Sequence, residues 1–170
     1  MNEFYHLDGI KNIILISSAK GGVGKSTVAI NIATALNQLK HNIGILDADV
    51  YGPSIPKMLG INEKPKISED KRLIPIEKFN MKCMSIGFLI EQKTPLIWRG
   101  PMIIKAIKQM LSGVVWDGVD TLVIDLPPGT GDVQLTICQK LKISGVIVVS
   151  TPQELALIDA VKGINMFKKL

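Results

Sequence analysis

Short apolar runs alternate with longer amphipathic segments along most of this 170-residue chain. Mostly apolar runs of four to six residues have the length of buried β-strands. Their continuous apolar character is typical of parallel sheets, in which both faces are covered. We therefore predict five parallel strands, over residues 13–16, 43–46, 81–86, 122–125 and 146–150.

Four further segments repeat apolar residues at helical spacing and predict helices over 26–39, 101–111, 133–141 and 153–170. Pro101 suits the first turn of its helix, and Asp132 is a candidate N-cap. The side chains expected on the apolar faces are Val28, Ile32, Ala35, Leu36 and Leu39 in the first helix, Ile103, Ile104, Ile107 and Leu111 in the second, and Leu157, Val161, Ile164 and Phe167 in the last. Strands that alternate with helices predict βαβ units, and hence an α/β fold with a mainly parallel sheet and helices on both faces.

Composition narrows the classes of protein to consider. Hydrophobic residues make up 46% of the chain, which favours a folded globule. We expect a single domain over residues 1–170, with the segment 52–79 as a loop-rich excursion from it. The net charge is +5, but the lysines are scattered, so we expect a solvated surface and no nucleic-acid partner. No apolar run approaches the roughly 20 residues of a membrane helix. No targeting segment is evident at the start, so we expect a cytoplasmic protein without a membrane partner.

A glycine-rich loop carries the first candidate chemistry. Residues 18–27 read Ser-Ala-Lys-Gly-Gly-Val-Gly-Lys-Ser-Thr, between the first predicted strand and the first predicted helix. In this context the sequence indicates the phosphate-binding loop of a P-loop NTPase, although Ala19 replaces the first glycine of the general pattern. Lys25 would reach the β- and γ-phosphates of a nucleotide, and the Ser26 hydroxyl would bind Mg²⁺. The expected nucleotide contacts in this loop are Gly21, Gly22, Val23, Gly24, Lys25, Ser26 and Thr27.

Three aspartates follow predicted strands, at the edge where an open parallel sheet binds its ligands. Asp125 is the candidate Walker B residue, held near Mg²⁺ directly or through a water, and the alternative is an ordinary turn aspartate. Asp49 would orient the attacking water and Asp47 would hold the water shell of the metal, although both residues also suit the start of a turn or helix. Gly129, in the loop after Asp125, would contact the γ-phosphate and make that loop a switch.

Lys20, the early lysine of the loop, is either simply solvated or functional. The run 20–25 resembles the deviant loop of the MinD/ParA superfamily of ATPases, in which this lysine crosses a dimer interface to the partner's nucleotide. From about residue 9 onwards the chain also resembles the Mrp/ApbC family, through the segments 47–56, 98–101, 125–132 and 150–153. Members of that family are homodimeric ATPases that carry or assemble iron-sulfur clusters.

The resemblance implies a homodimer that binds ATP and Mg²⁺ and works with iron-sulfur client or scaffold proteins. It implies that the nucleotide and hydrolysis positions are Lys20, Lys25, Ser26, Thr27, Asp49 and Asp125. Taken with the reasoning from the residues, we expect Lys20, Lys25 and Asp49 to be catalytic. We expect the metal to be held by Ser26, Asp47 and Asp125.

The sequence departs from the family in its cysteines. The family has a Cys-x-x-Cys pair whose thiolates hold a cluster shared by two subunits, and that pair lies beyond the position of Leu170. Cys83 and Cys138 do not match the motif, and we expect them to pack as small hydrophobes. Two explanations fit: a truncated or split product that lacks its last strands, or a complete five-stranded domain. We expect the first, which would leave an unpaired sheet edge prone to association.

Three functions are compatible with these features. The leading hypothesis is a slow Mg-dependent ATPase that acts in iron-sulfur cluster assembly or transfer, without the cysteine pair. A second is a ParA/MinD-like positioning protein that binds DNA or membrane when ATP is bound. A third is a nucleotide-binding remnant without turnover. The choice of ATP over GTP comes from the resemblance, although the guanine motif Asn-Lys-x-Asp is also absent from the sequence.

Overall fold

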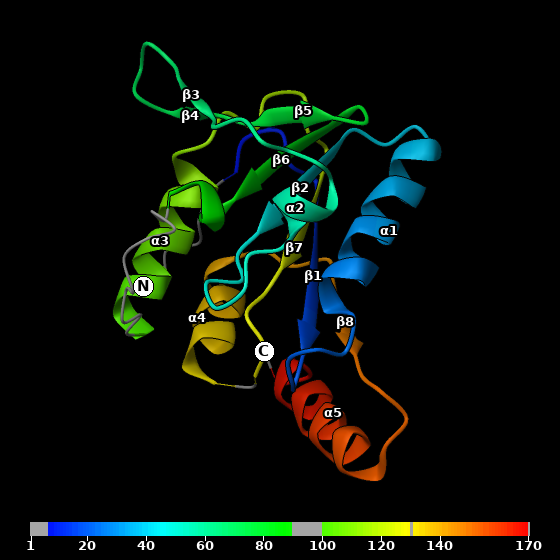
Figure 1. The fold of residues 1–170 in the computed structure, drawn as a ribbon. Coiled ribbons are helices and arrows are strands. Elements are labelled where there is room, and N and C mark those ends of the chain that lie inside the picture. The colour runs from blue at the N-terminus through cyan, green and yellow to red at the C-terminus, as the bar shows by residue number, and fades with distance from the viewer. Residues whose placement is uncertain (1–6, 90–99, 130, 170) are drawn as a thin grey trace.

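One sheet organises the part of the chain that the computed structural model describes, residues 7–89, 100–129 and 131–169. Its strands lie in the order β5-β6-β2-β7-β1-β8 (Figure 1). Antiparallel pairing joins β5 to β6, and the other four pairs are parallel. The strands are β1 (Asn12–Ser18), β2 (Ile43–Asp47), β5 (Ile76–Lys78), β6 (Met81–Ser85), β7 (Thr121–Asp125) and β8 (Gly145–Val149). The predicted mainly parallel sheet is therefore confirmed.

The five predicted strands correspond to β1, β2, β6, β7 and β8, with ends that shift by at most two residues. Strand β5 was missed, because three residues inside a polar segment give too little periodicity to detect. The segment 52–79 is also more ordered than the loop-rich excursion that we expected. It contains α2 (Ile55–Met58) and a two-stranded hairpin of β3 (Lys66–Ile67) and β4 (Leu73–Ile74) before β5 joins the main sheet.

Helices cover both faces of the sheet, as predicted (Figure 1). Ile16 and Val123 pack with Ala33 of α1 on one face, whereas the adjacent Leu15 and Leu122 point into the other core, beneath α3 and α4. This alternation follows from the two-residue period of a strand. A 3₁₀ turn, Ile86–Phe88, follows β6, and the longer helices are α1 (Lys25–Gln38), α3 (Gly100–Ser112), α4 (Asp132–Lys140) and α5 (Glu154–Phe167).

The expected apolar face of α1 was partly wrong. Leu39 is 70% exposed, and the apolar residues of α1 that are fully buried are Ala29 and Ala33. A helix that continues directly from the phosphate loop starts close to the strand ends. Small side chains on its inner side let the helix axis lie close to the strands. On α3 the expected face is confirmed, since Ile103 and Ile107 are fully buried.

The last strand and helix form where they were predicted, but their expected burial was wrong. β8 is only half-buried rather than buried, because it is the edge strand of the sheet. On α5 the buried residues are the small ones, Ala156, Ala160 and Gly163. Three residues of the apolar stripe that we predicted to face the sheet are exposed instead: Leu157, Val161 and Ile164. The helix touches the sheet mainly at β8, so only a narrow strip of its surface is covered.

Helix α4 begins at Asp132, and its N-cap is Gly131 rather than the predicted Asp132.

Cys83 and Cys138 are both buried, in the cores on opposite faces of the sheet. Burial raises the pKa of Cys83 to about 12 and that of Cys138 to about 11, so both thiols stay protonated at neutral pH. Within the described residues, no helix is long and apolar enough to cross a membrane.

Candidate functional site

The carboxyl ends of the central strands bring the predicted acidic residues together. Asp47 at the end of β2 is in register with Asp125 at the end of β7 on one side, and with Ser85 at the end of β6 on the other. Asp125 is in turn opposite Ile16 of β1, two residues before the phosphate loop begins. Parallel pairing therefore places the loop and the carboxylates at one edge of the sheet, as expected from the position of ligand sites in such folds.

The glycine-rich loop leaves β1 and turns directly into α1. Gly22 (φ 77°) and Gly24 (φ 89°) both adopt left-handed backbone conformations, which a side chain disfavours. Gly24 is also the N-cap of α1, so Lys25 is the first helical residue. The amides of a helix N-terminus lack partners within the helix and carry partial positive charge, which suits them to an anion. The local conformation is therefore that of a phosphate cradle.

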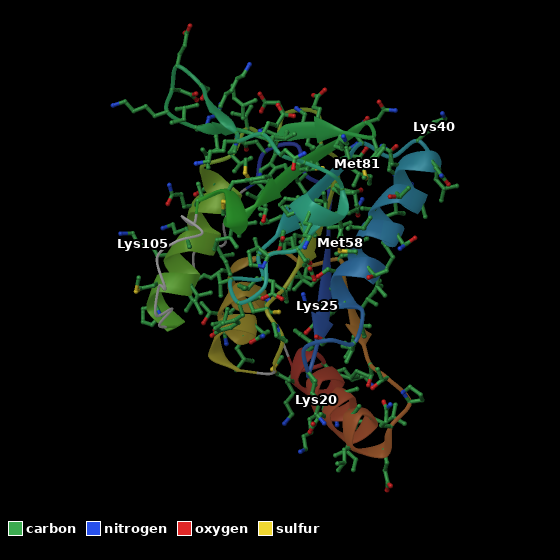
Figure 2. All side chains as sticks on the ribbon, viewed as in Figure 1. Lys20, Lys25, Lys40, Met58, Met81 and Lys105 are labelled. Atoms are coloured by element: carbon green, nitrogen blue, oxygen red, sulfur yellow. The ribbon has the colours of Figure 1, made fainter. Side chains whose placement is uncertain are left out.

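Lys25 lies at the centre of the site and is only 6% exposed (Figure 2). Its ammonium is 2.6 Å from Oδ1 of Asp125 and 3.3 Å from Oδ2 of Asp49. The hydroxyl of Ser26 donates to Oδ2 of Asp125 at 2.5 Å, so both oxygens of that carboxylate are engaged by the start of α1. The structure thus joins the loop lysine, the loop serine and the predicted Walker B aspartate in one contact network.

Charge balance in this network is tight. Burial raises the pKa of Asp125, while the Lys25 ammonium and the Ser26 hydroxyl oppose that rise. Asp49 contributes a second carboxylate beside the same lysine, and its other oxygen, Oδ1, accepts hydrogen bonds from the amides of Tyr51 and Gly52 at 3.1 and 3.2 Å. Asp49 therefore connects the lysine to the loop after β2, and its role in orienting water stays a prediction.

Asp47 has different surroundings from those expected for a residue at the water shell of a metal. It is fully buried, and its oxygens accept hydrogen bonds from the amides of Asp49 and Ile55 and from the hydroxyl of Ser85. Burial, reinforced by the negative charge of Asp125, raises the pKa of Asp47 to about 7. In this structure Asp47 shapes the loop 48–55, and its contact with a metal shell stays a prediction.

Gln134 is a residue that the sequence reasoning missed. It is buried on α4, donates to the carbonyl of Pro127 at 2.8 Å and accepts from the amide of Gly131 at 3.1 Å. The available signal was its position three residues after the N-cap, where a glutamine often bonds back to the cap amide.

Gly129, the predicted γ-phosphate contact, is tied to the phosphate loop, because its amide donates to the carbonyl of Ser18 at 2.7 Å. Thr130, Trp98 and Arg99, from motifs used in the sequence argument, lie outside the described residues.

A cavity of about 400 Å³ opens between the phosphate loop and the loop after β2. The predicted nucleotide contacts that line it are Gly21, Gly22, Gly24, Lys25, Ser26 and Thr27, whereas Val23 and Gly129 are not among its lining residues. The described lining also includes residues that we did not predict: Ser18, Tyr51, Gly52, Ser54, Met58 and Pro128. A wider hollow of about 710 Å³ lies between α4, β8 and α5, but its lining has neither the glycine-rich loop nor the strand-end carboxylates. The smaller cavity is therefore the candidate site.

Lys20 is separated from the rest of the predicted site. It is not among the described residues that line the cavity, and its side chain is 47% exposed. Its ammonium is 3.2 Å from Oδ2 of Asp159 on α5. Within this chain Lys20 therefore points away from the cradle formed by its own loop.

Comparisons with known proteins relate this chain to a family. The family model ParA, described as "NUBPL iron-transfer P-loop NTPase", matches residues 9–170. An Arabidopsis thaliana protein named "Iron-sulfur protein required for NADH dehydrogenase, mitochondrial" is 54% identical over 96% of this chain and 53% of its own length. The iron-sulfur cluster carrier protein of Escherichia coli K12 is 51% identical over 96% of this chain and 45% of its own length. The chain thus spans about half the length of these curated relatives.

A solved structure from Archaeoglobus fulgidus, a nucleotide-binding protein in complex with ADP, is 40% identical and superposes with a TM-score of 0.78. The match covers 95% of this chain and 64% of that one. The P-loop NTPase fold predicted from the glycine-rich loop is therefore confirmed. The matches in sequence and in structure together show that the chain belongs to the NUBPL iron-transfer P-loop NTPase family.

Proposed function

We propose that residues 1–170 form a P-loop ATPase domain that binds and slowly hydrolyses Mg·ATP, and that it acts in iron-sulfur cluster assembly or transfer. The observation that carries the nucleotide part is the network of Lys25, Ser26 and Asp125 at the mouth of the glycine-rich loop. Lys25 is neutralised by the carboxylates of Asp49 and Asp125. An incoming triphosphate offers the lysine a more highly charged partner, so binding exchanges one set of ion pairs for another.

The donors around this network fit Mg²⁺. Hydroxyl and carboxylate oxygens are the ligands that this ion accepts, and Ser26 and Asp125 already lie 2.5 Å apart across a hydrogen bond. The ion, when bound, neutralises charge on the phosphate oxygens. We propose that Asp49, held by the amides of Tyr51 and Gly52, accepts a hydrogen bond from a water and orients it. Asp47 keeps this loop in place from beneath, through the amides of Asp49 and Ile55.

Adenine nucleotide is supported by the relative solved in complex with ADP. Handling of iron-sulfur clusters is supported by the names of relatives that are 54% and 51% identical to this chain. The cluster would be cargo, and this chain offers no pair of thiolates for it, because Cys83 and Cys138 are buried on opposite faces of the sheet. We propose that a homodimer forms when ATP is bound, with Lys20 reaching the nucleotide of the partner subunit. A cytoplasmic location stays a proposal, since one relative is named as mitochondrial.

Calorimetry tests the nucleotide proposal directly. Wild type and Lys25→Ala are titrated with a non-hydrolysable ATP analogue in the presence and absence of Mg²⁺, and Lys105→Ala, on the exposed side of α3, is the matched control (Figure 2). We expect Mg-dependent binding by wild type and control, at least tenfold weaker binding by Lys25→Ala, and weak competition by GTP. Equal affinity of Lys25→Ala and wild type would overturn the proposal.

Turnover and cluster handling need separate measurements. Phosphate release above the rate without protein, lost in Asp49→Asn while nucleotide binding persists, would support hydrolysis with Asp49 as the residue that orients water. Phosphate release at the background rate, despite confirmed binding, would show a nucleotide-binding remnant. Transfer of a reconstituted cluster to an apo-ferredoxin, with and without ATP, tests the assembly role, and transfer that is independent of this chain would exclude it.

A further inference from the structure

The ion pair between Lys20 and Asp159 joins the phosphate loop to a helix that begins 134 residues later in the chain. Strand pairing explains why the two segments meet. Ser18, the last residue of β1, is in register with Val149, the last residue of β8. The phosphate loop and the segment that leads into α5 therefore leave the sheet at adjacent positions. This places Asp159, in the second turn of α5, beside the loop.

The backbone of Lys20 is fixed independently of its side chain. The Ser18 hydroxyl donates to the carbonyl of Lys20 at 2.8 Å, and the Ser18 carbonyl accepts the amide of Gly129 at 2.7 Å. What can change without disturbing the cradle is the direction of the Lys20 side chain. In this structure Asp159 sets that direction, toward α5 and away from the cavity.

Asp159 does not depend on Lys20 for its charge partner. Its other oxygen, Oδ1, is 3.3 Å from the ammonium of Lys162, one turn further along α5. When Lys20 leaves, the carboxylate keeps an ion pair and is not left unpaired. Release of Lys20 therefore costs little free energy. Lys162 also competes with Lys20 for the same carboxylate.

We propose that Asp159 is a positioning residue that holds Lys20 against its own chain and so restrains ATP-dependent pairing of two copies. This inference rests on the proposed function, in which Lys20 reaches the nucleotide of the partner subunit. An exposed ion pair of this kind shifts an equilibrium by a factor of about 1.5 to 5. Two lysines must be released for each homodimer, so the dimerisation constant should shift by the square of this factor, about 2- to 25-fold.

The contact itself can be measured without any dimer. Lysine amines of the nucleotide-free protein are labelled by reductive methylation, and the labelling rate of each lysine is followed by mass spectrometry. Asp159→Asn should raise the rate at Lys20 by about 1.5 to 5-fold. Lys162→Met should lower it, because Asp159 then has Lys20 as its remaining partner in this contact. An unchanged rate at Lys20 in both variants would overturn the proposal.

Glu154→Gln is the matched control for the labelling experiment. It removes the same charge from the same helix, but five residues earlier and hence about 140° around the helix axis from Asp159. The rate at Lys20 should not change in this variant. An equal increase in Glu154→Gln and Asp159→Asn would show a general electrostatic effect of α5, and would also overturn the proposal.

Sedimentation of the same variants with Mg²⁺ and a non-hydrolysable ATP analogue tests the consequence. Asp159→Asn should tighten the dimer by about 2- to 25-fold, Lys162→Met should weaken it, and Glu154→Gln should match wild type. Weaker pairing in Asp159→Asn would show that this carboxylate completes the dimer rather than restraining it. If the variants bind the analogue but form dimers equally well, the inference fails and the nucleotide site stands. If wild type binds no analogue, the proposed function fails, and the labelling rates still decide whether Asp159 holds Lys20.

Discussion

Replacing Lys25 by methionine removes the cation that faces two carboxylates at the centre of the site. Asp125 is fully buried and lies 2.6 Å from this lysine, so the substitution leaves a buried negative charge without its ion pair. Breaking a buried pair in this way costs about 3–5 kcal/mol. The Ser26 hydroxyl still donates to Asp125, and the carboxyl can also take up a proton, which removes the buried charge. Both effects reduce the free-energy cost of the substitution. We therefore expect the free energy of unfolding of Lys25→Met at pH 8 to be about 2–3 kcal/mol lower than that of wild type.

The loss should depend on pH with a defined sign. Burial already raises the pKa of Asp125, and removal of the nearby ammonium raises the pKa further. The folded variant then binds a proton more readily than the unfolded chain, so the variant should lose stability as the pH rises through the pKa of the folded state. The slope contributed by one group is at most about 1.4 kcal/mol per pH unit. The defect of Lys25→Met should accordingly be smaller at pH 5 than at pH 8.

Urea unfolding followed by circular dichroism measures this defect for wild type, Lys25→Met and the exposed control Lys105→Met. Lys25→Met combined with Asp125→Asn removes both charges of the closer pair and should recover part of the stability, because Asp49 loses its lysine but still accepts the amides of Tyr51 and Gly52. The double variant should still bind nucleotide at least tenfold more weakly than wild type, which separates the structural contribution of the pair from its function. Lys25→Met with wild-type stability at pH 8 and an unchanged pH profile would refute the contact on which this reasoning depends.

Three further outcomes are expected. Gly24→Ala should lose about 1–2 kcal/mol and bind nucleotide less tightly, because Gly24 has φ 89° although no atom crowds its Cβ position. Gly21→Ala, equally uncrowded and without a positive φ, should match wild type in thermal unfolding, and an equal loss of stability in both variants would exclude backbone strain as the cause. The pKa of Asp47 is raised from 3.8 to about 7, so its ionisation should lower the unfolding free energy as the pH rises between these values, and urea titrations at pH 5 and 7 should show a flatter profile in Asp47→Asn. Gln134→Ala removes the hydrogen bonds to Pro127 and Gly131 and should cost about 1–3 kcal/mol. Hydrogen exchange at the Gly131 amide should then accelerate, and unchanged protection would contradict the assigned bond.

Local signals determined much of this protein. The apolar runs predicted five strands, and the glycine-rich loop predicted both a nucleotide cradle and the start of α1, because these features depend on neighbouring residues. The sequence also indicated that Asp47, Asp49 and Asp125 would gather at one edge of the sheet, since the carboxyl ends of parallel strands meet there. The resemblance to iron-sulfur cluster carriers extended this reasoning to the family, which the comparisons confirmed.

Tertiary structure decided how these residues are used. Periodicity identifies an apolar stripe but not what covers it, so α5 presents Leu157 to solvent and buries Ala160, because its neighbour is an edge strand. Asp47 and Asp49 are two residues apart in sequence, yet one is buried beneath a loop and the other faces Lys25, a distinction set by which amides each carboxylate meets. The contact between Lys20 and Asp159 spans 139 positions of sequence and exists because β8 pairs with β1. Such pairings depend on sheet order, which no local pattern encodes.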